Sequence, residues 1–201
     1  MQTDYLQPDF YRFSDDSLKL VNFVLDDFNH TKDILALDLC AGSGVVGIEL
    51  AIAYAQKKNK ISKLDFCEVQ DAFLPYLEKN CAFFLNDFPR TIYHQNYQDL
   101  KLDTKYDLIV SNPPYFFQGR GLLSPQLEKN RCRFFLDSNL KEFFLCLVRH
   151  LKVGGTAYFL SRPDEQELSV AQSALPLEFV FLHKKDFGSC ALYAIENRSL
   201  L

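Results

Sequence analysis

Short apolar runs alternate along the chain with longer stretches in which apolar residues recur at helical spacing. The short runs predict strands at residues 34–40, 63–69, 91–97, 106–112, 156–161, 179–184 and 190–196. The longer stretches predict helices at residues 15–28, 45–57, 73–84, 139–151 and 164–174. Strands that alternate with helices are typical of parallel βαβ units. We therefore expect an α/β fold, with an open sheet covered by helices on both faces.

The last two predicted strands depart from this alternation. Only residues 185–189 separate them, which is too short for a crossover helix. They must form an antiparallel hairpin, so we expect a seven-stranded, mostly parallel sheet whose last strand is antiparallel. One long segment, residues 116–137, shows no regular pattern. Segments of that length inside a compact domain are usually functional or disordered.

The composition fits a single domain spanning residues 1–201. Of the 201 residues, 24% are charged and 48% hydrophobic, which is enough for a sizeable core. The 22 basic and 26 acidic residues give a formal net charge of −4, which excludes a generally polybasic protein but allows a local basic face. The first 30 residues are expected to form a helical segment that contributes to the functional site.

Three patterns that the sequence lacks narrow the class of protein to which it can belong. The six cysteines form no C-x-x-C pair, so we expect neither a metal site nor a disulfide framework. No apolar run is long enough to span a membrane, and the first residues do not have the pattern of a secretory signal. We therefore expect a reduced, cytoplasmic protein that binds no membrane and no metal.

A glycine-rich turn follows the first predicted strand. Its residues Gly42, Gly44 and Gly47 satisfy the spacing G-x-G-x-x-G, which also occurs in dinucleotide-binding proteins. Two carboxylates favour another ligand. Asp38 lies where it would repel a pyrophosphate but receive an ammonium group, and Glu68 ends the second strand, where it can accept both ribose hydroxyls. A ligand with a ribose, an amine and no phosphate is S-adenosylmethionine. The alternative is that both are ordinary carboxylates at strand ends.

The third predicted strand brings further polar residues to the same edge of the sheet. We expect Asn96 to bind the adenine of the cofactor, with Tyr97 beside the ring. Asp99 is a competing candidate, because the end of this strand is uncertain by two residues. A simple polar loop remains an alternative for each of them.

The fourth predicted strand ends in Asn112-Pro113-Pro114-Tyr115. The side-chain oxygen of Asn112 and the carbonyl of Pro113 can accept both hydrogens of one planar NH₂ group. This localises the lone pair on the nitrogen, which can then attack a methyl sulfonium without a strong base. Tyr115 and Phe116 offer flat faces for an extruded base. The alternative is a strand-ending turn with no chemical role.

Residues 38–44 (DLCAGSG), Glu68 and residues 112–115 (NPPY) resemble the motifs of class I S-adenosylmethionine-dependent N-methyltransferases. The resemblance implies a Rossmann-like, seven-stranded sheet with the last strand reversed. Cys40 and Ala41 depart mildly from the usual motif, aspartate-x-glycine-x-glycine-serine-glycine, in which they occupy the place of the first glycine and the variable place after it. The cofactor residues that the resemblance and the spacing together imply are Asp38, Cys40, Ala41, Gly42, Gly44, Glu68, Val69, Asn96, Tyr97 and Asn112.

Within that class, residues 10–18 and 112–117, followed by an arginine-bearing stretch, resemble the bacterial tRNA adenine-N6 methyltransferases that act beside the anticodon. The resemblance implies catalytic roles for Asn112, Pro113, Pro114 and Tyr115. Enzymes with this motif also methylate guanine N2, DNA adenine or glutamine in release factors. The first strand begins near residue 34 and little follows residue 196, so we expect no added recognition domain.

Basic residues are expected to gather at the carboxyl edge of the sheet, where they would face nucleic-acid phosphates. The candidates for substrate contact are Tyr115, Phe116, Arg120, Arg131, Arg133, Lys184 and Lys185, with Lys129 and Arg162 nearby. The alternative is that these charges are merely solvated. We therefore expect a monomeric enzyme that methylates adenine N6 in tRNA. Another NH₂ target, or a non-catalytic subunit with the same fold, is the competing hypothesis.

Overall fold

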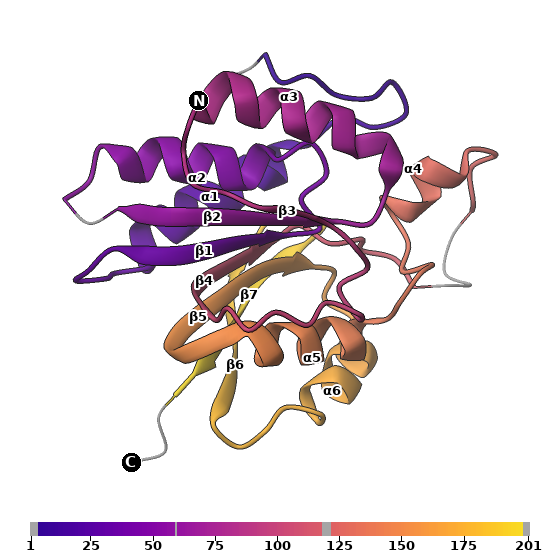
Figure 1. The fold of residues 1–201 in the computed structure, drawn as a ribbon. Helices are drawn as coiled ribbons and strands as arrows, with labels where there is room; N and C mark the ends of the chain where they lie inside the picture. Colours follow the sequence, from indigo (N-terminus) through magenta and orange to yellow (C-terminus); the bar gives the residue numbers. More distant parts are fainter. Residues whose placement is uncertain (1–3, 59, 118–121, 199–201) are drawn as a thin grey trace.

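The computed structural model describes residues 4–58, 60–117 and 122–198 (Figure 1). Its centre is one sheet of seven strands in the order β3-β2-β1-β4-β5-β7-β6. The strands are β1 (Ile34–Leu39), β2 (Ile61–Glu68), β3 (Ile92–His94), β4 (Tyr106–Ser111), β5 (Leu151–Ser161), β6 (Phe179–Asp186) and β7 (Ala191–Asn197).

Strands β1 to β5 pair in parallel, whereas β7 is antiparallel to both β5 and β6. Helices cover both faces, as Figure 1 shows. One face carries α1 (Asp15–Asp27), α2 (Val45–Ala55) and α3 (Leu74–Leu85), and the other carries α5 (Leu140–His150) and α6 (Glu165–Gln172). The predicted α/β fold, with a mostly parallel sheet and a reversed last strand, is confirmed.

The alternation of side chains along the strands determines where the site residues lie. In β1, Ala36 packs in the core beneath α1, α2 and α3, while Leu37 and Leu39 pack in the core beneath α5 and α6. Asp38 shares the face of Ala36, so its side chain lies beneath α2 and is 1% exposed. A carboxylate is thereby buried at the end of the central strand.

The third strand and the segment after β4 differ from expectation. β3 ends at His94, because the next residues form a turn in which the Asp99 N–H donates to the Asn96 carbonyl. Residues 116–137 are less irregular than expected: they contain the short helix α4 (Leu127–Arg131) and a bridge between Phe116 and Phe134. The pattern had no long periodic run there, since α4 has only five residues.

The chain before α1 is extended and lies along α3, as the indigo trace in Figure 1 shows. The Asn80 side chain of α3 fixes it, because Asn80 accepts from the Leu6 N–H and donates to the Leu6 carbonyl, both at 2.9 Å. The Tyr5 hydroxyl donates to the buried Glu49 of α2 at 3.0 Å. These contacts bring residues 7–17 to the carboxyl edge of the sheet.

Candidate active site

Two adjoining cavities lie at the carboxyl ends of β1, β2, β3 and β4, where ligands bind in open α/β sheets. The larger encloses about 680 Å³ of empty space and the smaller about 410 Å³, part of each being open to solvent. They share the lining residues Tyr11, Cys40, Gly42, Phe73 and Asn112.

The turn after β1 separates the two cavities and has the unusual backbone that its glycines allow. Gly42 and Gly44 have φ angles of 54° and 84°, and Gly44 is the residue that caps α2. Gly47 has a different role, since a Cβ there would lie 2.9 Å from Asp38 Oδ2. The absence of a side chain lets α2 approach the strand end closely.

Asp38 lies at the floor of the smaller cavity. Its Oδ2 accepts from the Gly47 N–H at 2.8 Å, at the N-terminus of α2. The pKa of this carboxyl is raised to about 7: burial is the largest cause, the Gly47 hydrogen bond opposes the shift, and the nearby charge of Glu68 adds to it. A cationic group entering this cavity would therefore favour the ionised form of a carboxyl that is half protonated near neutral pH.

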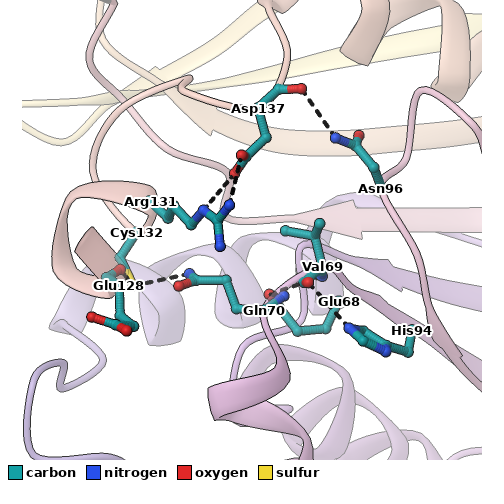
Figure 2. A network of polar contacts seen from close by, with 9 residues as sticks. All are labelled: Glu68, Val69, Gln70, His94, Asn96, Glu128, Arg131, Cys132 and Asp137. Carbon is teal, nitrogen blue, oxygen red and sulfur yellow. Dashed lines mark hydrogen bonds and ion pairs between the residues drawn. The ribbon is translucent and has the colours of Figure 1, made fainter.

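Glu68 ends β2 and is held by three backbone amides. Its Oε2 accepts from Gly42 N–H at 2.7 Å, and its Oε1 accepts from Val69 and Gln70 N–H at 2.9 and 2.8 Å. Burial raises the pKa of Glu68, and the three amide bonds oppose that shift. Figure 2 shows Glu68 with Val69 and Gln70, and the His94 ring that contacts the Val69 carbonyl. A carboxylate oxygen has more than one lone pair, so a ligand hydroxyl can still bind.

Asn96 lines the larger cavity and Asp99 does not. The Asn96 side-chain amide is engaged at both ends, because its Nδ2 donates to the Asp137 carbonyl at 3.1 Å (Figure 2) and its Oδ1 accepts from the Gln98 N–H. Asn96 therefore joins the end of β3 to the segment after β4. Tyr97 also lines this cavity and packs edge-on against Phe143.

Asn112 follows β4 at the junction of the two cavities. Its Nδ2 donates to Ser17 Oγ of α1 at 2.9 Å, and its Oδ1 accepts from the Tyr115 hydroxyl at 2.5 Å. Burial raises the pKa of Tyr115, so its hydroxyl stays protonated and remains a donor. The two contacts fix the orientation of the Asn112 amide, with its oxygen on the side of Tyr115.

The segment after β4 forms the outer wall of the larger cavity. The Arg131 guanidinium pairs with both carboxylate oxygens of Asp137 at 3.1 Å, and Gln70 Nε2 donates to Cys132 Sγ at 3.5 Å (Figure 2). The sequence had indicated a functional role for this segment and for the first 30 residues, but it named none of the following cavity residues individually as site residues: Tyr11, Ser17, Gln70, Cys132, Asp137 and Ser138. Gln70 could have been found, because it follows Glu68 and Val69 at the end of β2.

The basic residues expected at one rim lie in different surroundings. Arg131 is paired with Asp137, and Arg133 is exposed over the Phe116 ring. Lys184 pairs with Asp27 at 3.0 Å and with Glu196 at 3.6 Å, because a bulge in β6 turns it toward the end of α1. Lys185 is exposed beside Phe187, and Arg120 lies outside the described residues. Of the candidates that the structure describes, Arg133 and Lys185 are exposed, whereas Arg131 and Lys184 are already paired with carboxylates.

Across the ranges that the structure describes, no group of three His, Cys, Asp or Glu side chains is arranged to hold a metal ion. Within the same ranges, no helix is both long and apolar enough to cross a membrane.

The family model of the methyltransferase small domain matches residues 13–125. The tRNA1(Val) (adenine(37)-N6)-methyltransferase of Actinobacillus pleuropneumoniae is 29% identical over 147 residues, which are 73% of this chain and 58% of that protein. The release factor glutamine methyltransferase of Leptospira interrogans is 30% identical over 165 residues, 77% of this chain and 56% of that protein. The chain thus spans less than two thirds of the length of these relatives.

Solved structures share the fold at low sequence identity. The T. thermophilus 16S rRNA N2 G1207 methyltransferase, in complex with AdoMet and guanosine, has a TM-score of 0.66 and 19% identity. That match covers 93% of this chain and 44% of the other. The ribosomal protein L11 methylase of Lactobacillus delbrueckii has a TM-score of 0.63 and 18% identity, and the match covers 92% of this chain and 81% of the other.

Proposed function

Because the chain belongs to the methyltransferase small-domain family, we propose that it is an S-adenosylmethionine-dependent enzyme that methylates adenine N6 in tRNA. The observation that carries the proposal is the position of Asn112, whose amide lies where the two cavities meet. A methyl donor in the cavities and an amino group at Asn112 would therefore be neighbours. We place this activity in the cytoplasm, where tRNA is modified.

The residues around the cavities fit the proposed cofactor. Asp38 is a buried carboxyl that accepts a hydrogen bond from the Gly47 N–H and has no cation acting on it among the described residues, so it suits an ammonium group. Glu68 borders the larger cavity and suits the ribose hydroxyls, with Val69 beside it. When bound, S-adenosylmethionine supplies a methyl group on a positively charged sulfur. The positive φ of Cys40 and Gly42 lets the backbone of Cys40, Ala41 and Gly42 curve around that ligand.

The target amino group is proposed to bind at Asn112 and Pro113. Asn112 Oδ1 and the Pro113 carbonyl accept one hydrogen each, which retains the lone pair on the nitrogen. Tyr115 must first release Asn112 Oδ1, because its hydroxyl occupies that oxygen at 2.5 Å. Ser17 Oγ continues to accept the hydrogen bond from Asn112 Nδ2, so the Asn112 oxygen stays directed at the target. Pro114 borders the larger cavity and keeps this turn rigid.

A transfer assay with tritiated S-adenosylmethionine tests the proposal. The purified protein is offered total tRNA, DNA and a protein fraction from the same cells, followed by mass spectrometry of the nucleosides. We expect N6-methyladenine in tRNA, and a tRNA1(Val) transcript carrying guanine at position 37 should accept no label. Label in glutamine alone would assign the activity of the second relative instead. A protein that binds the cofactor but labels none of these fractions would be a non-catalytic member of the fold.

A further inference from the structure

Two guanidinium groups lie over one aromatic ring directly after the Asn-Pro-Pro-Tyr turn. The Arg162 guanidinium carbon is 4.2 Å from the centroid of the Phe116 ring, and that of Arg133 is 5.3 Å from the same centroid. The Phe116 ring also packs against Phe134, with the two centroids 5.1 Å apart. Phe116 is thus occupied by neighbours and serves as a support for the two cations, which leaves base stacking to Tyr115.

The backbone holds these residues in place from two separate elements. The N–H groups of Tyr115 and Phe116 both donate to the Arg133 carbonyl, at 3.0 and 2.8 Å. Arg162 directly follows β5, whose Phe159 is in register with Ser111 of the neighbouring β4. Arg133 is thus bonded to the residues directly after the Asn112 turn, and Arg162 lies at the end of the strand next to β4. The sheet therefore fixes the positions of both arginines relative to that turn.

Both arginines are free of carboxylate partners among the residues that the structure describes. Arg133 and Arg162 are exposed and form no ion pair there, whereas neighbouring Arg131 is paired with Asp137. Two like charges over one ring repel each other unless an anion binds near both. A guanidinium is planar and presents N–H donors that match the oxygens of a phosphate group. The surroundings therefore favour an anion with several oxygens.

We propose that Arg133 and Arg162, supported by Phe116, bind the phosphate backbone of the substrate strand beside the target nucleotide. This inference rests on the proposed function and extends it, since it assigns the recognition of a nucleic acid to a defined pair of residues. A glutamine side chain in a protein carries no adjacent phosphate, so such a pair would favour RNA over a protein substrate.

The test compares Arg133→Gln, Arg162→Gln and the double variant with the parent. Binding of a tRNA1(Val) transcript is followed by fluorescence anisotropy across a salt series, and cofactor binding by calorimetry. We expect each single change to weaken RNA binding about tenfold, with cofactor affinity unchanged. Each change should also make the log–log salt slope shallower by about 0.7, the value of one lost phosphate contact on a single strand.

Two further variants distinguish the loss of the proposed phosphate site from a change in net charge and from a folding defect. Lys57→Gln removes a cation that lies 4.6 Å from the Tyr54 ring, beyond the far end of α2, and should leave RNA binding unchanged. Phe116→Leu keeps an apolar side chain but removes the ring, and should weaken RNA binding as an arginine variant does. Equal losses in Lys57→Gln and the arginine variants would overturn the proposal, because the effect would then be one of net charge.

The failure of this inference is distinguishable from the failure of the proposed function. If the parent methylates tRNA while the double variant binds and responds to salt as the parent does, the arginine pair is not a phosphate site and the proposed function stands. If the parent methylates a protein glutamine and not tRNA, the proposed function falls. The proposed phosphate site is contradicted as well if the parent binds RNA no more tightly than the double variant does.

Discussion

The Tyr115 hydroxyl donates a hydrogen bond to Asn112 Oδ1 at 2.5 Å. This is the oxygen that we propose as an acceptor for the target amino group, so an internal donor takes the place of the substrate. Binding of the target must exchange one hydrogen bond for another, which costs less than leaving the oxygen unpaired. Tyr115 therefore keeps a buried acceptor satisfied until the substrate arrives.

This relationship predicts the effect of Tyr115→Phe. The variant keeps the ring face for base stacking and removes the competing donor, so we expect the single-turnover rate of methyl transfer to stay within about threefold of the parent. Tyr115→Ala removes the stacking face, worth about 1–3 kcal/mol, and should raise the KM for tRNA about tenfold or more. Equal KM values in the two variants would show that the ring does not hold the base.

Asn112→Ala should lower kcat by about 10²–10³, the usual effect of removing one preorganised polar partner of a transition state. Asn112→Asp keeps an acceptor oxygen and should retain more activity than the alanine variant. Ser17→Ala serves as a milder companion, because it removes only the group that accepts from Asn112 Nδ2 at 2.9 Å. The measurement is single-turnover transfer at saturating cofactor. Parent-like rates in Asn112→Ala would mean that the Asn-Pro-Pro-Tyr turn has no chemical role.

The raised pKa of Asp38 predicts that cofactor binding depends on pH. Burial raises the pKa of this carboxyl from 3.8 to about 7, and an ammonium group requires the ionised form. Cofactor affinity should therefore increase about tenfold between pH 6 and pH 8, with about one proton released at the lower pH. Calorimetry in buffers of different ionisation enthalpy measures both quantities. Asp38→Asn should bind weakly with the pH dependence removed, and a variant that keeps the dependence would assign it to another group.

The same shift has a consequence for stability, and its sign is opposite to that of a salt-bridged carboxylate. Since the folded protein binds this proton more tightly than the unfolded chain, Asp38 stabilises the fold below pH 4 and loses that contribution as the pH rises to about 7. Chemical unfolding of the parent and Asp38→Asn at pH 5 and pH 8 should show a smaller loss with rising pH in the variant. An equal loss in both proteins would contradict the assignment.

Gly47→Ala tests the close approach of α2 to β1. A Cβ at this position would lie 2.7 Å from Phe66 Cε1 and 2.9 Å from Asp38 Oδ2, in a buried environment that cannot yield freely. We expect a loss of about 1–3 kcal/mol in the free energy of unfolding, and weaker cofactor binding because Asp38 must move. Ala55→Gly, at the exposed end of the same helix, is a matched control and should cost no more than about 1 kcal/mol with cofactor binding unchanged.

The sequence was sufficient for the fold because local patterns decide it. Apolar runs of strand length alternate with helical stretches, and the five residues between the last two predicted strands left only an antiparallel hairpin. The same logic placed Asp38, Glu68, Asn96 and Asn112 at one edge, since parallel strands end together. All four line one or both cavities.

What the sequence did not reveal depends on contacts between distant residues. The bond from Asn96 to the Asp137 carbonyl joins residues 41 positions apart and requires the conformation of the segment after β4. Lys184 is turned toward Asp27 by a bulge in β6, and a bulge shifts which face of a strand a side chain occupies. Strand periodicity alone carries no signal for either feature.

The stretch from Cys132 to Phe135 presents different residues to different sides. Cys132, Phe134 and Phe135 line the larger cavity, while Arg133 between them is exposed beside Phe116. One piece of backbone therefore borders both the proposed cofactor and the proposed RNA strand. Any ligand that orders this stretch makes it easier for the other to bind, and thermodynamic reciprocity requires the two affinities to change by the same factor. Loss of either ligand would then weaken the binding of the other by that factor.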